Sequence, residues 1–110
     1  MKSRNLLYIF IFLILILLTT VVSYFTVLNY IKTAPSVVED TVIEIPKGSG
    51  LSSISKKLMQ SGVIANDKVF ILYVMKEGWQ DELKAGEYKF EKGSTMADVT
   101  NKIVRGDVEL

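Results

Sequence analysis

The chain has 110 residues, of which 49% are apolar, and it carries a formal net charge of +1. It contains no cysteine and no histidine, which excludes disulfides, thiolate nucleophiles, Ser-His or Cys-His catalysis and metal sites built on either residue. From Thr33 onward the chain has ten basic and twelve acidic residues, and the basic residues form no stripe. This argues against nucleic acid as a partner.

The first predicted element is one long apolar helix. The 26 residues from Leu6 to Ile31 carry no charge. A helix of that length is about 39 Å long, which exceeds the roughly 30 Å hydrocarbon core of a bilayer. Secretory signal peptides have a shorter apolar region, and the fewer than 80 residues after Lys32 could not cover a buried core helix. We therefore predict an uncleaved transmembrane helix over residues 6–31, after a basic start over residues 1–5.

The basic residues around this span predict its orientation. Lys2 and Arg4 precede the apolar run, and only Lys32 follows it closely. The positive-inside bias then places the N-terminus in the cytoplasm and the rest of the chain outside. We expect a single-pass membrane protein with an extracytoplasmic C-terminal domain, and the absence of cysteine is compatible with an external bacterial domain.

The remaining chain divides into a linker and one small domain. Residues 32–40 include Pro35 and show no clear periodicity, which predicts a linker. Residues 41–110 show short patterns typical of strands and helices. The predicted elements are a strand at 41–45, helices at 51–61 and 68–77, a strand at 87–90 and a helix at 96–105.

Local signals define the helix faces and ends. Leu51, Ile54 and Leu58 recur at i, i+3 and i+7, which places them on one helix face. Thr95 and Asp98 have the spacing of a capping box. Two helices between two strands return the chain to the end where the first strand finished, so the strands can pair antiparallel with both helices on one face. This predicts an α+β fold, a βααβ unit with an additional C-terminal helix.

A short internal repeat recurs at an offset of 45 residues. The matching segments are Lys47-Gly48-Ser49 with Lys92-Gly93-Ser94, and Leu51, Ile54 and Leu58 with Met96, Val99 and Ile103. Two copies are too few for a solenoid. We interpret the repeat as one local solution used twice, in which a strand turns sharply and a small polar residue begins a helix.

An ordered series of motifs resembles a known family. The basic start and the single span are followed by Ile45-Pro46-Lys47-Gly48-Ser49, Gly62-Val63-Ile64, Lys84-Ala85-Gly86-Glu87-Tyr88 and Lys92-Gly93-Ser94-Thr95-Met96. This series resembles the N-terminal part of the endolytic murein transglycosylases, the MltG/YceG-like family, and residues 84–88 are its most specific piece. The resemblance covers almost the whole chain, and it implies that residues 41–110 form a LysM-like domain.

The resemblance also implies a function. It predicts a module of the bacterial cell membrane that binds or positions peptidoglycan in cell-wall metabolism, with glycan strands and cell-wall synthesis proteins as candidate partners. The family's catalytic glutamate lies in a later domain that no residue here matches, so we assign no catalytic residue and leave open whether this protein is an enzyme. Since the chain ends about where the catalytic part should begin, we expect a truncated enzyme, a fragment or a stand-alone module. The alternative is a membrane-anchored protein-interaction module that binds no glycan.

The candidate glycan-binding residues come partly from the same resemblance. In LysM-like units the edge between strand and helix lines the glycan groove, which here corresponds to Gly48, Ser49, Leu51 and the connector Val63-Ile64. Trp79 follows a helix-ending glycine, and its ring could stack on a sugar, although a lid over the core is the commoner role for tryptophan. We expect no metal and no cofactor.

Three carboxylates lie closest to apolar residues, at Glu44, Glu77 and Glu87. Glu44 and Glu87 alternate with inward-facing residues, so both should face water. A transglycosylase needs a carboxylic acid that is held protonated, and solvated carboxylates are poor acids at neutral pH. We therefore predict no catalytic use for them.

Overall fold

A computed structural model describes residues 2–109, and the chain divides into two compact units, one up to Tyr30 and one from Ile31 onward. The first unit lies within α1 (Lys2–Thr33). Its most apolar window has a mean hydropathy of 2.8, and among the described helices α1 alone is long and apolar enough to cross a membrane. The Thr19 and Thr20 hydroxyls donate to carbonyls one turn earlier, at 2.8 Å, so they are compatible with an apolar environment.

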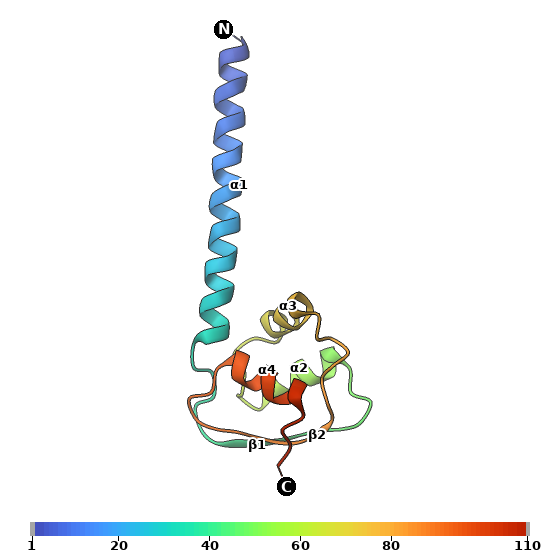
Figure 1. Cartoon of the computed structure of the whole chain (residues 1–110). Coiled ribbons are helices and arrows are strands. Elements are labelled where there is room, and N and C mark those ends of the chain that lie inside the picture. The colour runs from blue at the N-terminus through green and yellow to red at the C-terminus, as the bar shows by residue number, and fades with distance from the viewer. Residues whose placement is uncertain (1, 110) are drawn as a thin grey trace. The chain divides into compact units, whose positions relative to one another are not determined.

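The second unit, which we call the folded unit, is a small α+β structure (Figure 1). Its elements are, after the last turn of α1, β1 (Thr41–Ile45), α2 (Leu51–Gln60), α3 (Asp67–Glu77), β2 (Gly86–Phe90) and α4 (Met96–Arg105). The two strands pair antiparallel, with Ile43 opposite Tyr88. The predicted α+β class and the βααβ order with a further helix are therefore confirmed.

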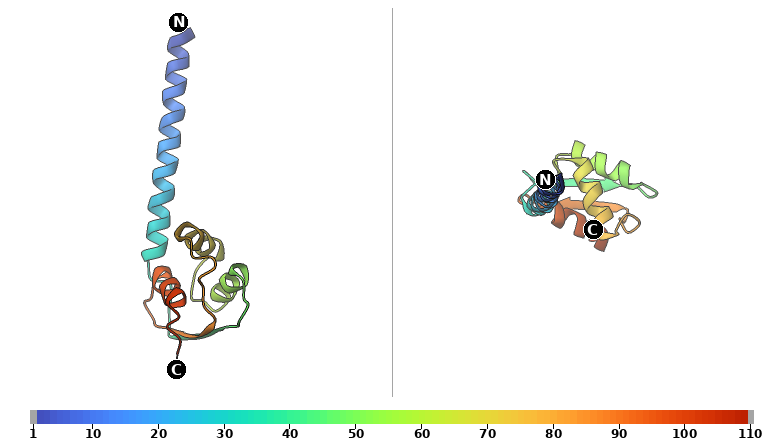
Figure 2. Two further views of the ribbon diagram at one scale, coloured as in Figure 1. Left: turned by 45° about the vertical axis from the view of Figure 1, so that its right-hand side comes forward. Right: turned by 90° about the horizontal axis from the view of Figure 1, so that it is seen from above.

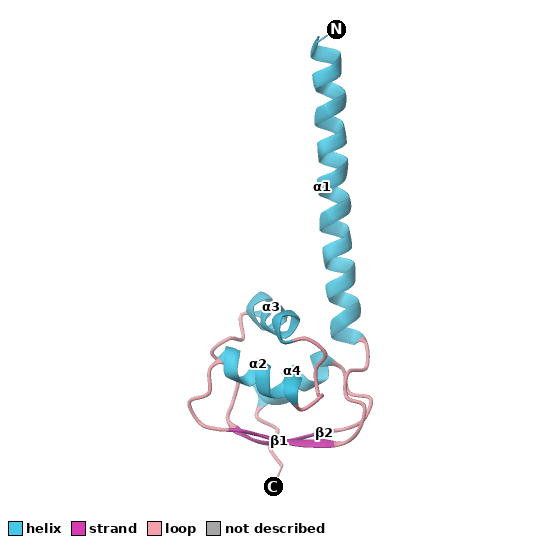
Figure 3. Cartoon of the chain, turned by 180° about the vertical axis from the view of Figure 1, so that it is seen from behind, coloured by secondary structure: helices cyan, strands magenta, loops and turns pink. Residues whose placement is uncertain are grey.

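All three helices of the folded unit cover the same face of the sheet (Figures 1 and 3). The helices α2 and α4 lie side by side next to the strands, and α3 lies on their far side (Figure 2). Ile43 and Ile45 from β1 and Tyr88 and Phe90 from β2 are at most 3% exposed and form the sheet side of the core. The opposite face of the sheet is open, and Val42 on it is 56% exposed.

The sequence repeat is also a structural repeat. When the bounds of β1 and α2 are shifted by 45 residues, they coincide with the bounds of β2 and α4. The turns match as well, because Gly48 and Gly93 have φ angles of +80° and +90°, which favour glycine. Ser49 N donates to the Pro46 carbonyl at 3.3 Å, and Ser94 N donates to the Glu91 carbonyl at 3.0 Å.

The repeat also explains the strand register. Ile43 and Tyr88 are equivalent positions of the two copies, and they lie directly opposite each other in the sheet. Two antiparallel strands are related by a local twofold axis, and this axis passes through the Ile43–Tyr88 pair. The buried hydroxyls are equivalent too, since Ser55 and Thr100 are both 0% exposed and both donate to a carbonyl in the preceding turn. Among the described elements from β1 to α4, α3 alone has no counterpart.

The helix ends differ little from the prediction. The helix α2 ends at Gln60 instead of Ser61. The helix α3 begins at Asp67, and the Asn66 side chain caps it by accepting from Lys68 N at 2.9 Å and Val69 N at 3.1 Å. The Thr95–Asp98 capping box is present.

The segment expected to be a linker is ordered against the folded unit. The helix α1 continues to Thr33, and Val37 is 2% exposed in the core. The Val37 carbonyl accepts from Gly93 N at 2.8 Å, and the Ser94 carbonyl accepts from Val37 N at 3.1 Å. A buried valine with paired backbone groups fixes this segment, which sequence periodicity could not reveal because the partners are more than 50 residues away.

Candidate functional site

The predicted glycan-binding residues lie in three different environments. Gly48 is exposed in the β1–α2 turn, and Ser49 beside it is half-buried with its hydroxyl donating to the Pro46 carbonyl at 2.7 Å. Leu51 is half-buried and packs against the core at the start of α2. This turn therefore offers backbone and small side chains at the surface.

The other predicted residues point into the core. Val63 and Ile64 are 0% and 3% exposed, so their side chains have almost no surface with which to contact a ligand. Trp79 is half-buried, with its ring perpendicular to that of Tyr73 at 6.1 Å between centroids. These three side chains support the fold from within, and Trp79 forms a partial lid over the core.

One surface groove adjoins the predicted turn, and we call it the turn groove. Its volume is about 300 Å³, and its lining consists of Glu44, Ile45, Pro46, Lys47, Ala85, Gly86 and Glu87. Glu44 and Glu87 are paired across the two strands, and both are exposed as predicted. The groove contains none of the predicted glycan-binding residues themselves, but Lys47 is the immediate neighbour of Gly48.

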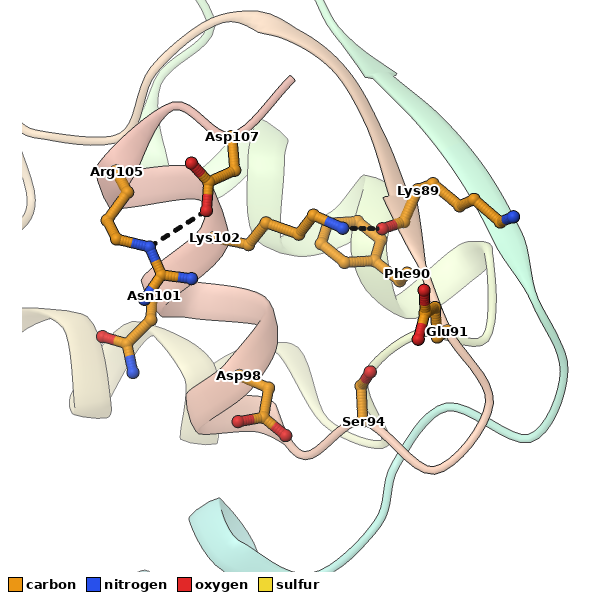
Figure 4. A pocket seen from close by; sticks show the side chains of 9 residues that line it. All are labelled: Lys89, Phe90, Glu91, Ser94, Asp98, Asn101, Lys102, Arg105 and Asp107. Atoms are coloured by element: carbon orange, nitrogen blue, oxygen red, sulfur yellow. Dashed lines mark hydrogen bonds and ion pairs between the residues drawn. The ribbon is translucent and has the colours of Figure 1, made fainter. Parts of the chain in front are cut away.

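A second groove runs between β2 and α4, and we call it the edge groove (Figure 4). Its volume is about 310 Å³, and its lining consists of Lys89, Phe90, Glu91, Ser94, Asp98, Asn101, Lys102, Arg105 and Asp107. The Lys102 ammonium donates to the Lys89 carbonyl and lies 6.0 Å from the centre of the Phe90 ring. Arg105 Nε donates to Asp107 at 3.0 Å. Several charged groups of this groove are therefore already paired within the protein.

The most specific motif, residues 84–88, holds the end of α4. Lys84 N donates to the Ile103 carbonyl at 3.3 Å, and the Lys84 ammonium donates to the Val104 carbonyl. The Tyr88 hydroxyl donates to the Lys84 carbonyl at 2.7 Å and lies 3.4 Å from the Ile103 carbonyl. The last carbonyls of a helix have no partner within the helix, and this motif provides partners for two of them.

The same motif also holds the chain that follows α4. Glu109 N donates to the Glu87 carbonyl at 2.7 Å, on β2. Gly86 has a φ of +147°, and a Cβ atom built there would lie 2.3 Å from Val108 Cγ1. A glycine is therefore required both by the backbone and by the close approach of Val108. The sequence identified this motif by resemblance, but its contacts with residues 103–109 depend on the tertiary structure.

The two tyrosines of the core remain protonated at neutral pH. Burial, and to a lesser extent the charge of Asp107, raises the pKa of Tyr88 above its ordinary value of 10.0. Burial, followed by the charge of Glu77, raises the pKa of Tyr73 in the same way. Both phenols therefore act as hydrogen-bond donors or packing groups and not as bases.

The three carboxylates considered from the sequence, Glu44, Glu77 and Glu87, are all exposed. Glu44 and Glu87 line the open turn groove, and Glu77 lies at the end of α3. Within residues 2–109, no group of three or more acidic side chains is arranged to hold a metal ion.

Comparison with known proteins identifies the family. The chain consists of an apolar helix followed by this α+β unit. Residues 43–110 of the chain match the model of the YceG-like family. The chain belongs to the YceG-like family. The match begins within β1 and extends past α4, so it covers most of the folded unit.

One similar solved structure is the crystal structure of the YceG-like protein lmo1499 from Listeria monocytogenes. It is 33% identical, its TM-score is 0.59, and the alignment covers 64% of this chain and 23% of that one. The chain therefore corresponds to about a quarter of the length of that protein. No curated protein matches the chain.

Proposed function

We propose that this protein is a membrane-anchored module that binds or positions peptidoglycan in bacterial cell-wall metabolism. The observation that carries this proposal is the YceG-like match over residues 43–110, which follows a helix long and apolar enough to span a bilayer. The resemblance to endolytic murein transglycosylases supplies the substrate class. In this proposal α1 crosses the membrane with its N-terminus in the cytoplasm, and the folded unit is a LysM-like domain on the outside.

The turn groove is the best candidate for the glycan contact. Exposed Lys47, Glu44 and Glu87 can form hydrogen bonds with hydroxyl and acetamido groups, and Gly48 and Ser49 lie directly beside them. A groove of about 300 Å³ is at the lower end of the size of ligand sites. We expect low affinity for a single glycan segment, because few contacts are available to offset the lost translational freedom.

Co-sedimentation with purified insoluble peptidoglycan tests this proposal, with the full chain in detergent micelles. We expect the chain to sediment with peptidoglycan, and Lys47→Ala to reduce the bound fraction. Lys56→Ala is a matched control, because Lys56 is an exposed lysine of α2 that lines neither groove. Trp79→Ala tests whether the indole adds a stacking contact.

Two outcomes would contradict the proposal. If the chain does not sediment at any concentration, and Trp79→Ala behaves identically, glycan binding is excluded. If chromatography of the supernatant shows anhydro-sugar products, the assignment of no catalytic residue is wrong.

The second candidate function is a protein-interaction module without glycan binding. A specific observation favours it, because α3 exposes Leu72 by 47% and Met75 by 57%. Exposed apolar side chains that lie close together commonly mark an interaction site.

A further inference from the structure

The outward side of α3 combines apolar and basic residues. We define the outer face of α3 as Lys68, Leu72, Met75 and Lys76, all exposed. These four helical positions are spaced i, i+4, i+7 and i+8, so they form one stripe along the helix. Half-buried Trp79 follows just after the helix and packs against the core beside Tyr73.

The opposite side of α3 is also apolar. Phe70, Tyr73 and Val74 are at most 4% exposed and pack into the core. A helix with apolar residues on both sides is expected to be covered on both sides. Within the folded unit, α2 and α4 lie on the core side of α3 (Figure 2), so neither of these helices covers the outer side.

The residues at which the chain leaves its apolar segment contact the folded unit, and one of them lies against α3. Ile31 and Lys32 belong to the folded unit, where Ile31 packs against the core and the Lys32 ammonium lies 5.7 Å from the centre of the Tyr73 ring. Lys32 is also the first charged residue after the uncharged run that ends at Ile31. There is little free chain between them and the core, because Val37 is already buried.

We propose that the outer face of α3 binds the lipid surface at the point where the apolar segment enters the bilayer. This inference depends on the membrane anchoring proposed above. Leu72 and Met75 enter the boundary between headgroups and acyl chains, as the apolar residues of interfacial helices do. Lys68 and Lys76 flank them and extend their ammonium groups toward lipid phosphates. The bilayer is favoured over a protein partner because Lys32, the first charged residue after the apolar run, lies against Tyr73 of the same helix.

The chain contains its own probe for this contact, because Trp79 is its single tryptophan. The full chain is reconstituted in vesicles of phosphatidylethanolamine and phosphatidylglycerol that contain lipids brominated at different depths, and tryptophan fluorescence is measured. We expect quenching of Trp79, strongest for the bromines closest to the headgroups. The double variant Leu72→Glu/Met75→Glu should lose most of this quenching.

Val42→Glu is the matched control, because Val42 is 56% exposed but lies on the open face of the sheet, on the opposite side of the folded unit from α3 (Figure 1). It should leave the quenching unchanged. Flotation of the vesicles after alkaline extraction reports separately whether α1 is inserted. A chain that is extracted contradicts the anchoring itself.

A chain that stays inserted, but whose Trp79 is not quenched at any depth, overturns the inference and leaves the anchoring intact. If the double variant does not fold, the depth profile of the unmodified chain decides alone. Crosslinking of the outer face to a second protein, with no quenching, would assign it to a protein partner instead.

Discussion

At the scale of single residues, Gly86 has the tightest surroundings of the glycines. Its φ is +147°, and the side chain of Val108 occupies the space that a Cβ would need. Gly48 also has a positive φ, +80°, but no atom lies within 4 Å of its Cβ position. The two glycines therefore separate the cost of backbone conformation from the cost of a steric clash.

This difference predicts the behaviour of a pair of variants. Gly86→Ala and Gly48→Ala should each lower the free energy of unfolding by about 1–3 kcal/mol, the usual cost of a strained backbone conformation, and Gly86→Ala should lie at the upper end. Adding Val108→Ala should recover part of the loss at Gly86 and none at Gly48. Urea titration of the full chain in detergent, followed by Trp79 fluorescence, measures both. Equal recovery at the two positions would show that Val108 does not pack on Gly86.

At the scale of elements, the repeated strand–turn–helix pair is held together by different means in its two copies. The helix α4 begins with a capping box at Thr95, whereas Gly50 begins α2 without a side-chain cap. The second copy is also tied to the end of its own helix through Tyr88, whose equivalent in the first copy is Ile43. A tyrosine at the axis of the repeat can donate a hydrogen bond that an isoleucine cannot.

The raised pKa of Tyr88 predicts a dependence of stability on pH. Because the folded-state pKa lies above the unfolded value of 10.0, the phenol contributes stability below that pH, and this is lost as the pH rises through the folded pKa. Tyr88→Phe should lower the free energy of unfolding by about 1 kcal/mol at neutral pH, through the lost hydrogen bonds. The free energy of unfolding of this variant should also decline less above pH 10. The part of the decline that is still due to a tyrosine should then come from Tyr73.

Urea titrations between pH 8 and pH 11 provide the measurement, and the difference between the two proteins isolates Tyr88 from the titrating lysines. Parallel curves for the variant and the unmodified chain would contradict the link between the Tyr88 phenol and alkaline unfolding.

At the scale of the whole molecule, the topology is a prediction from charge. Lys2 and Arg4 outnumber Lys32, so the folded unit should lie outside the cell. Protease added to intact protoplasts should then digest the folded unit, as it does after lysis. Protection in intact protoplasts, followed by digestion after lysis, would reverse the orientation.

The sequence determined the elements and the family because those signals are local. The long apolar run, the glycines at positive φ and the capping box act within a few residues, so α1 and α4 follow from nearby positions. The ordered motifs also led to the YceG-like family, which the comparison confirmed. The antiparallel pairing of the strands was predicted because the two helices between them return the chain to the end where the first strand finished.

Only the tertiary structure decided what these residues contact. Val63 and Ile64 were predicted both to pack under the two helices and to lie at a binding edge, and the structure places their side chains in the core. The expected linker is held by Gly93 and Ser94, and the 84–88 motif holds the chain after α4. Such contacts join residues far apart in sequence, and periodicity carries no information about them because it reports only which face of its own element a residue occupies.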